Sequence, residues 1–184
     1  MSAKIAYLMR GLPSSGKSFT ARRLAGTDGV VLETDQYFYT EVGDDPTKFE
    51  FRRELMDTAR EWVFRRFCDA VAAGASPIVV DRGNALCELS ARFARYAVEH
   101  GYDVQLREPD SDIWQEIRVL LKYKDLTRTV LDQWAERLAD INKRTHGVSA
   151  RSIRRLMDKW RHDVTIEDIL KYKAKSKKAK AATE

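Results

Sequence analysis

A glycine-rich segment near the N-terminus carries the residues with the most specific chemistry in this chain. The pattern G-x-x-x-x-G-K-[ST] is matched at each defined position by Gly11-Leu12-Pro13-Ser14-Ser15-Gly16-Lys17-Ser18. Glycines at these positions allow consecutive backbone N–H groups to turn toward one anion. We predict that this loop and the next residue, Phe19, bind the phosphates of ATP, with Lys17 reaching the β- and γ-phosphates and the Ser18 hydroxyl binding Mg²⁺.

Two acidic residues follow short apolar runs farther along the chain. Asp35 comes just after the run 30–33, and Asp81 ends the run 77–81. In a parallel sheet the carboxyl ends of the strands lie at one edge, where ligands bind. We predict that Asp81 supports Mg²⁺ together with Ser18. Asp35 is the candidate base for the hydroxyl that accepts a phosphoryl group, and capping of the following turn is its structural alternative.

A third role is that of a cation that stabilises the transferred phosphoryl group. The basic corner 142–147 follows the fourth expected strand, where P-loop kinases carry a lid over the phosphates. Lys143, Arg144 and Arg151 compete for this role, and the bidentate grip of a guanidinium favours Arg144. The corner begins like the guanine-binding pattern N-K-x-D, but Thr145 stands in place of the acid. We therefore expect adenine as the base.

The elements that position these residues alternate along the first two thirds of the chain. Apolar runs typical of strands cover 5–9, 30–33, 77–81 and 102–107, and helical periodicity covers 19–25, 55–71, 88–100 and 112–121. This alternation predicts a doubly wound α/β fold with a mostly parallel sheet of about four to five strands. Together with the glycine-rich loop, it makes a P-loop kinase-like three-layer sandwich the expected architecture. The glycine-rich loop, Asp35 and Asp81 would then converge on one site.

Two amphipathic helices are expected after residue 121, where strand patterns end. The first carries an apolar face made of Val130, Leu131, Trp134, Leu138 and Ile141. The second begins near Ser149, a typical N-cap residue, and buries Ile153, Leu156, Met157 and Trp160. We interpret both faces as core, and we expect a helical lid over about 122–150.

Composition limits the class of protein. The chain has 184 residues, of which 43% are hydrophobic and 33% charged, so one domain with a sizeable core is expected. Apolar runs of the length that crosses a bilayer and a secretory signal are both absent from the sequence, which predicts a cytoplasmic protein that does not bind membranes. Cys68 and Cys87 fit no metal-binding spacing and are expected to be reduced, packed thiols.

The net charge of +5 comes from the C-terminal end. Residues 171–184 contain six lysines and one acid, which leaves 27 basic and 27 acidic residues in the rest of the chain. We expect this lysine-rich tail to be disordered. The tail could bind nucleic-acid phosphate backbones electrostatically, or it could be merely a solvated segment. The rest of the chain is neutral and gives no sign of a basic groove.

Several short segments occur in an order that resembles a known family. They are Arg10 to Ser18, Thr34-Asp35-Gln36-Tyr37-Phe38, Ile78 to Asn84, Glu108-Pro109-Asp110-Ser111, His146-Gly147-Val148 and Asp163-Val164-Thr165. Together they resemble the polynucleotide-kinase-like P-loop ATPases, a group that includes the kinase domain of the Nedd-four-binding protein and, more distantly, bacteriophage polynucleotide kinase. The similarity covers most of 3–170, so we expect a P-loop kinase domain over 1–170.

The resemblance implies ATP- and Mg²⁺-dependent phosphorylation of a 5′-hydroxyl on RNA or DNA. It also implies that Asp35 is the catalytic aspartate, that Asp81 and Asn84 belong to a D-x-T-N strand end, and that 143–146 forms the lid corner. The chain departs from the family pattern at Gln36, at Gly83 and in the lid corner. A kinase for a small molecule and a slow ATPase or adaptor without an acceptor therefore stay open as alternatives. The sequence leaves the oligomeric state open.

Overall fold

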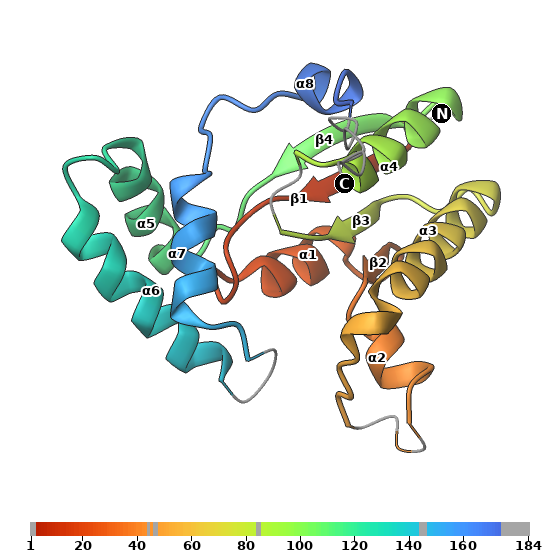
Figure 1. Ribbon diagram of the computed structural model, residues 1–184. Coiled ribbons are helices and arrows are strands. Elements are labelled where there is room, and N and C mark those ends of the chain that lie inside the picture. Colours follow the sequence, from red (N-terminus) through yellow and green to blue (C-terminus); the bar gives the residue numbers. More distant parts are fainter. Residues whose placement is uncertain (1–2, 44, 46–47, 84–85, 144–146, 174–184) are drawn as a thin grey trace, which may run out of the picture.

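The computed structural model describes residues 3–43, 45, 48–83, 86–143 and 147–173. Its centre is one parallel sheet in the order β2-β3-β1-β4 (Figure 1). The strands are β1 (Ile5–Met9), β2 (Val30–Glu33), β3 (Ile78–Asp81) and β4 (Asp103–Arg107). Glu33 pairs with Asp81, and Met9 with Arg107, so all four strands end at the same edge. The predicted fold class and the predicted strands are confirmed.

Eight α-helices and one 3₁₀ helix connect and cover the strands within the described residues. They are α1 (Lys17–Ala25), α2 (Gln36–Thr40), the 3₁₀ helix η1 (Arg53–Leu55), α3 (Met56–Ala72), α4 (Glu88–Glu99), α5 (Asp112–Lys122), α6 (Arg128–Asn142), α7 (Ala150–Asp158) and α8 (Ile166–Leu170). No helix in these ranges is both long and apolar enough to span a bilayer. The predicted disordered tail lies, from residue 174 onward, outside the described residues.

The two faces of the sheet are buried by different helices, which makes the predicted three layers. Tyr7, Met9 and Val79 point to one face and pack with Ala21 and Ala25 of α1. The alternate residues of the same strands, such as Leu8 and Val80, face a larger core that α3, α4 and α8 complete. Strands with apolar residues on both faces are typical of a parallel sheet covered on both sides.

A second core lies to one side of the sheet (Figure 1), where α5, α6 and α7 pack together. We call this set of helices the helical unit. Its buried members are Leu12, Trp114, Ile117, Leu121, Leu131, Trp134, Ala135, Leu138, Ile153, Met157 and Trp160. All of these except Leu12 belong to α5, α6, α7 or the residues just after α7. Leu12 comes from the glycine-rich loop, so the loop is packed into the helical unit.

The structure corrects part of the expected apolar face of α6. Val130 and Ile141 are 40% and 50% exposed, whereas Leu131, Trp134 and Leu138 are buried. The buried stripe repeats at intervals of three and four residues, and Val130 and Ile141 fall at its edge. On α7, Leu156 is only partly buried. The N-cap prediction for α7 is confirmed, since Ser149 Oγ accepts a hydrogen bond from Ser152 N.

Candidate active site

One cavity of about 560 Å³ opens at the carboxyl edge of the sheet, a size typical of small-molecule sites. Its lining comes from three stretches of chain and from a group of residues on other segments. They are the loop and start of α1 (Gly11 to Ser14 and Gly16 to Phe19), the end of β2 (Glu33 to Asp35), the end of β3 (Asp81 to Gly83), and the more apolar group of Met56, Ile141, Val148, Leu156 and Trp160. The predicted convergence of the loop, Asp35 and Asp81 is thus observed. Ser15 is the one predicted loop residue outside the lining.

The backbone of the glycine-rich loop includes two residues with positive φ. Gly16 has φ of 89° and Ser14 has φ of 61°, both in the left-handed region. A Cβ on Gly11 would lie 2.7 Å from Ser15 Oγ and 3.0 Å from Lys17 Cγ, so a side chain there would force these two side chains to shift. Ser15 is buried and its hydroxyl donates to Leu12 O at 2.7 Å. The Ser15 side chain therefore shapes the loop from behind and does not face the cavity.

Lys17 lies at the centre of the charged part of the cavity. Its Nζ donates a hydrogen bond to Leu12 O at 2.6 Å. Burial lowers the pKa of Lys17, and the charges of Asp81, Asp35 and Glu33 partly oppose this effect. Three carboxylates therefore act on one ammonium group. Glu33 was not predicted as a site residue, although its place at the end of β2, next to Thr34 and Asp35, was a usable signal.

Asp35 stands at the N-cap position of α2, but its side chain makes no capping hydrogen bond. The structural alternative considered for this residue, capping of the following turn, is therefore not observed. Asp35 lines the cavity and acts electrostatically on both Lys17 and Arg82. This position is compatible with the predicted contact between Asp35 and an acceptor hydroxyl.

Asp81 fits the predicted role in magnesium binding. Its Oδ1 atom is buried and has no hydrogen-bond partner among the described residues, which is costly for a carboxylate unless a cation completes its environment. Ser18 lines the same cavity. Within the described ranges no group of three or more His, Cys, Asp or Glu side chains could hold a metal ion. A magnesium ion here would therefore need phosphate oxygens and water molecules as further ligands.

The segment after β4 is hydrogen-bonded to the glycine-rich loop and to the start of α1. Ser111 Oγ donates to Ser15 O at 2.8 Å, and the same hydroxyl caps α5 by accepting from Trp114 N. Asp110 Oδ1 accepts from Thr20 Oγ1 at 2.6 Å. These contacts give a physical role to the E-P-D-S segment that the sequence singled out, because they fix the loop and the start of α1 to the helical unit.

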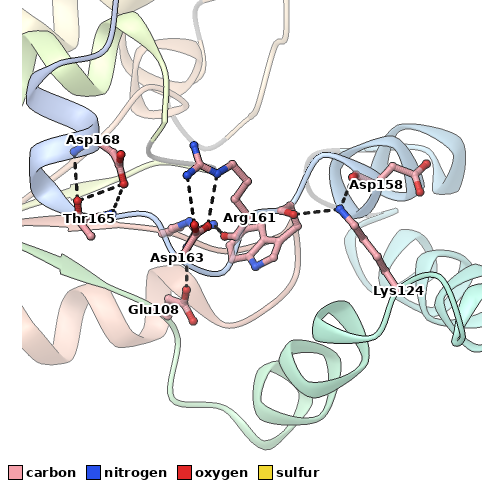
Figure 2. A network of polar contacts seen from close by, with 9 residues as sticks. Glu108, Lys124, Asp158, Arg161, Asp163, Thr165 and Asp168 are labelled. Atoms are coloured by element: carbon pink, nitrogen blue, oxygen red, sulfur yellow. Dashed lines mark hydrogen bonds and ion pairs between the residues drawn. The ribbon is translucent and has the colours of Figure 1, made fainter.

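A buried arginine, Arg10, connects the start of the glycine-rich loop with the segment after β4 and with the segment after α7. Arg10, which directly precedes Gly11, is 1% exposed, and its guanidinium lies 3.9 Å from the ring centre of Trp160. It pairs with Glu108 at 3.3 Å and donates to the carbonyl oxygen of Arg161. Figure 2 shows Glu108 close to Arg161 and Asp163, which lie on a segment far from Glu108 in the sequence. Burial lowers the pKa of Arg10, and Glu108 opposes this.

The opposite wall of the cavity is more apolar. Ile141, Val148, Leu156 and Trp160 line it from α6, α7 and the residues beside them, which explains why Ile141 and Leu156 are not fully buried. Ser14 Oγ donates to Leu138 O at 3.1 Å and ties the loop to this wall. The cavity therefore has a polar side formed by strand ends and an apolar side formed by the helical unit.

In the described part of the chain, none of the predicted lid cations lines the cavity. Arg144 lies outside the described residues, as do Asn84 and His146, while Lys143 and Arg151 are exposed and do not line the cavity. Among the described lining residues the cations are Lys17 and Arg82. Sequence reasoning missed Arg82, although its position directly after the strand-ending Asp81 pointed to the cavity.

The chain is similar in sequence to parts of two longer human proteins. The chain is 31% identical to NEDD4-binding protein 2 of Homo sapiens over 168 residues, which is 90% of this chain and 8% of that protein. It is 30% identical to YLP motif-containing protein 1 of Homo sapiens over 130 residues, or 59% of this chain and 6% of that protein. The chain thus spans less than a tenth of the length of these relatives.

A solved structure described as the Pnkp1/Rnl/Hen1 RNA repair complex contains a similar fold. The TM-score is 0.55 at 14% identity, and the match covers 86% of this chain and 44% of that one. A family model described as an AAA domain matches residues 7–139. Because this match covers well over half of the chain, the chain belongs to the AAA domain family, as a P-loop kinase-like member.

Proposed function

We propose that this chain is an ATP-dependent phosphotransferase that phosphorylates a hydroxyl group, and that the acceptor is the 5′-hydroxyl of RNA or DNA. One observation carries the proposal: the glycine-rich loop, Lys17, Asp35 and Asp81 all line a single cavity. Phosphoryl transfer depends on positioning and on charge stabilisation, and this cavity supplies both. The proposal assigns a role to each of these residues.

The loop N–H groups and Lys17 bind the β- and γ-phosphates. When ATP binds, Lys17 gives up its hydrogen bond to Leu12 O and donates to phosphate oxygens instead. Asp35 accepts the proton of the acceptor hydroxyl. The hydroxyl oxygen forms a bond to the γ-phosphorus while the bond from that phosphorus to the β–γ bridging oxygen breaks. The products are a phosphorylated acceptor and ADP, and Asp35 releases the proton to solvent.

Ser18 and Asp81 are the residues that would hold Mg²⁺, as the unpaired Oδ1 of Asp81 supports. When bound, Mg²⁺ neutralises part of the negative charge on the phosphate oxygens. The more apolar wall, including Ile141 and Leu156, is suited to a base, and we keep adenine as its occupant. Arg144 stays the proposed lid cation on the basis of the sequence alone.

The nucleic-acid acceptor rests on likeness to known proteins. The fold resembles that of a chain in an RNA repair complex, and the order of short motifs resembles polynucleotide-kinase-like proteins. A small-molecule acceptor is the second candidate, because the body of the chain before residue 171 contains equal numbers of basic and acidic residues. Such a balance gives little general attraction for a polyanion. The proposed compartment is the cytoplasm.

The test is transfer of label from γ-labelled ATP. Purified protein is incubated with Mg²⁺ and either 5′-hydroxyl oligonucleotides, the same oligonucleotides with a 5′-phosphate, or a metabolite pool. We expect label on the 5′-hydroxyl oligonucleotides only. Label on a metabolite would select the small-molecule kinase. ATP binding without transfer to any acceptor would select the slow ATPase or adaptor and would overturn the proposal.

Two variants check the assigned roles. Asp35→Asn should lower transfer by about 10²- to 10⁴-fold with ATP affinity nearly unchanged, as expected for loss of a general base. Lys17→Ala should weaken ATP binding as well as transfer. Asp125→Asn is the matched control, because Asp125 is exposed and lies outside the cavity lining. Retained turnover in Asp35→Asn would reject that residue as the base.

A further inference from the structure

The solvent side of α7 carries a row of cations. Arg151 and Arg155 on this helix and Lys159 at its end follow one another at intervals of four residues, and all three are exposed. Residues four apart share one side of a helix and are separated by about 6 Å along its axis. No ion pair within the described part of the chain includes any of the three. We call these three residues the basic row.

Helix stability does not account for the basic row. Like charges four residues apart on a helix repel one another. Arg151 lies in the first turn of α7, where the helix dipole disfavours a cation, and this turn contains no acidic residue. The dipole favours only Arg155 and Lys159, near the C-terminal end. The row therefore destabilises the isolated helix in part, which points to an anionic partner outside it.

The acids near this side of α7 are already engaged. Arg154 pairs with Asp132 of α6 at 2.6 Å and also with Asp158. Lys124 adds another cation at the end of α7, because its ammonium group donates to the carbonyl oxygens of Asp158 at 2.7 Å and of Trp160 at 3.2 Å. Figure 2 shows Lys124 beside Asp158. The surroundings of the basic row therefore add positive charge to it.

The basic row lies beside the cavity of the proposed active site. Leu156 and Trp160 line that cavity. Leu156 and Lys159 are three residues apart, so they are neighbours on the surface of α7. Residues 150–161 contain five basic residues and one acid, although the chain before residue 171 is neutral as a whole. The structure thus reveals a concentration of charge that the overall balance conceals, next to the proposed site.

We propose that the basic row binds the phosphate backbone of a nucleic-acid strand whose 5′ end lies in the cavity. This inference rests on the proposed function and extends it, since it concerns nucleotides several positions from the reacting hydroxyl. A row of regularly spaced cations suits a polymer with regularly spaced negative charges. Such contacts give affinity and orientation without reading the base sequence. Longer acceptors should therefore bind more tightly than dinucleotides.

The test measures how DNA binding depends on salt. A fluorescein-labelled single strand of about 12 nucleotides is titrated with protein at about 50 to 200 mM salt, with ADP and Mg²⁺ present, and anisotropy reports binding. Arg155→Gln/Lys159→Gln should weaken binding about tenfold at the lowest salt concentration. The slope of log affinity against log salt should become shallower by about 1.4, because each contact to a single strand contributes about 0.7. Arg151→Gln alone should change the slope by about half as much.

Arg22→Gln/Arg65→Gln is the matched control. It removes two exposed arginines, from α1 and α3, that lie outside the cavity lining. All variants keep residues 174–184, so the lysines of the tail contribute equally to each measurement. We expect the control to bind DNA with the affinity and the salt slope of the parent protein. Equal losses in the two double variants, or an unchanged slope in Arg155→Gln/Lys159→Gln, would overturn the role of the basic row.

Acceptor length and a second polyanion sharpen the test. In the transfer assay Arg155→Gln/Lys159→Gln should raise KM for the longer 5′-hydroxyl strand and leave kcat and KM for a 5′-hydroxyl dinucleotide unchanged. An equal rise in KM for both acceptors would contradict binding at a distance from the reacting end. Tighter binding of a polyglutamate peptide of equal charge would overturn the nucleic-acid partner in favour of an acidic protein segment. Absence of transfer, with DNA binding that still depends on the row, would count against the proposed function alone.

Discussion

The sheet and the helical unit contribute to the cavity in different ways. The sheet presents Glu33, Asp35 and Asp81 at strand ends, whereas the helical unit contributes mostly apolar side chains. The sheet is held by ladders of backbone hydrogen bonds and by two covered faces. The helical unit is held by one core that includes Leu12 from the loop. Charge placement is thus a property of strand ends, and loop support is shared between both regions.

This difference gives the glycine-rich loop two kinds of neighbour. On one side Gly11 N donates to Gly83 O at 2.9 Å, which ties the loop to the segment after β3. On the other side Leu12, Ser14 and Arg10 contact the helical unit or the segment after it. A rigid loop suits phosphate binding, because prearranged N–H groups need no reordering when the ligand arrives. We expect the helical unit to stabilise the loop as well as cover it.

Matched substitutions in the two cores compare the two regions directly. Leu32→Ala in the sheet core and Leu131→Ala in the helical unit both remove a side chain that is at most 1% exposed. Each should lower the free energy of unfolding by about 2–5 kcal/mol through lost burial and a residual cavity. Because Leu12 belongs to the core of the helical unit, we expect one cooperative transition in both variants.

Urea unfolding followed by two probes checks this. Trp114, Trp134 and Trp160 lie in the helical unit or directly after it, and Trp62 packs against the sheet core. Tryptophan fluorescence therefore reports mainly on the helical unit, while circular dichroism reports on the whole fold. Coincident midpoints are expected. A separate, earlier fluorescence transition in Leu131→Ala alone would mean that the helical unit unfolds independently of the sheet.

The pair Arg10 and Glu108 should respond asymmetrically to loss of either partner. Glu108→Ala leaves a buried guanidinium without its carboxylate and should cost about 3–5 kcal/mol in the free energy of unfolding. Arg10→Met should cost less, because Glu108 keeps Trp114 Nε1 at 3.1 Å and Arg118 at 3.0 Å and has a side chain that is 21% exposed. Thermal unfolding of both variants measures the difference. Equal losses would contradict the assignment of Arg10 as the more dependent partner.

The strand ends illustrate how far the sequence could predict this molecule. Short apolar runs gave the strands within one residue, and because parallel strands end at one edge, Asp35 and Asp81 could be placed together before any coordinates. The short helices α2 and α8 were missed, because five residues are too few for a helical period. The Thr165–Asp168 capping box was the one local sign of α8.

Contacts between distant segments could not be predicted from the sequence, for a different reason. The position of Leu12 in the core of the helical unit and that of Arg10 on Trp160 depend on tertiary packing, to which no local pattern corresponds. Ile141 was expected in the core because it is apolar, but the apolar wall of the cavity exposes it. Arg82 was missed because a single arginine in a sequence is ordinarily interpreted as an exposed surface residue until its burial is known.

The lowered pKa of Lys17 predicts how ATP affinity changes with pH. Phosphates favour the charged ammonium, so ATP binding should raise this pKa above its value in the free protein. Affinity should be constant below the free-protein pKa and should fall as the pH rises through it, starting below the ordinary lysine range. Titrating ATP at pH 8 and above measures this, because the phosphates are then fully ionised. In Lys17→Arg the decline should disappear, since a guanidinium does not titrate there; if it persists, another group is responsible.

The smallest expected effect concerns the single hydrogen bond from Ser14 Oγ to Leu138 O, which joins the loop to α6. Ser14→Ala should lower the free energy of unfolding by about 0.5–1.5 kcal/mol, the net contribution of one such bond. Ser14→Gly also loses this bond, but it relieves the backbone strain of φ at 61°, so its loss should be smaller. Denaturant unfolding of the three proteins gives this order, and the opposite order would place the strain elsewhere. If both variants also weaken ATP binding by the same factor, the bond to α6 orders the loop for its ligand, and the helical unit then contributes to phosphate binding without touching the phosphates.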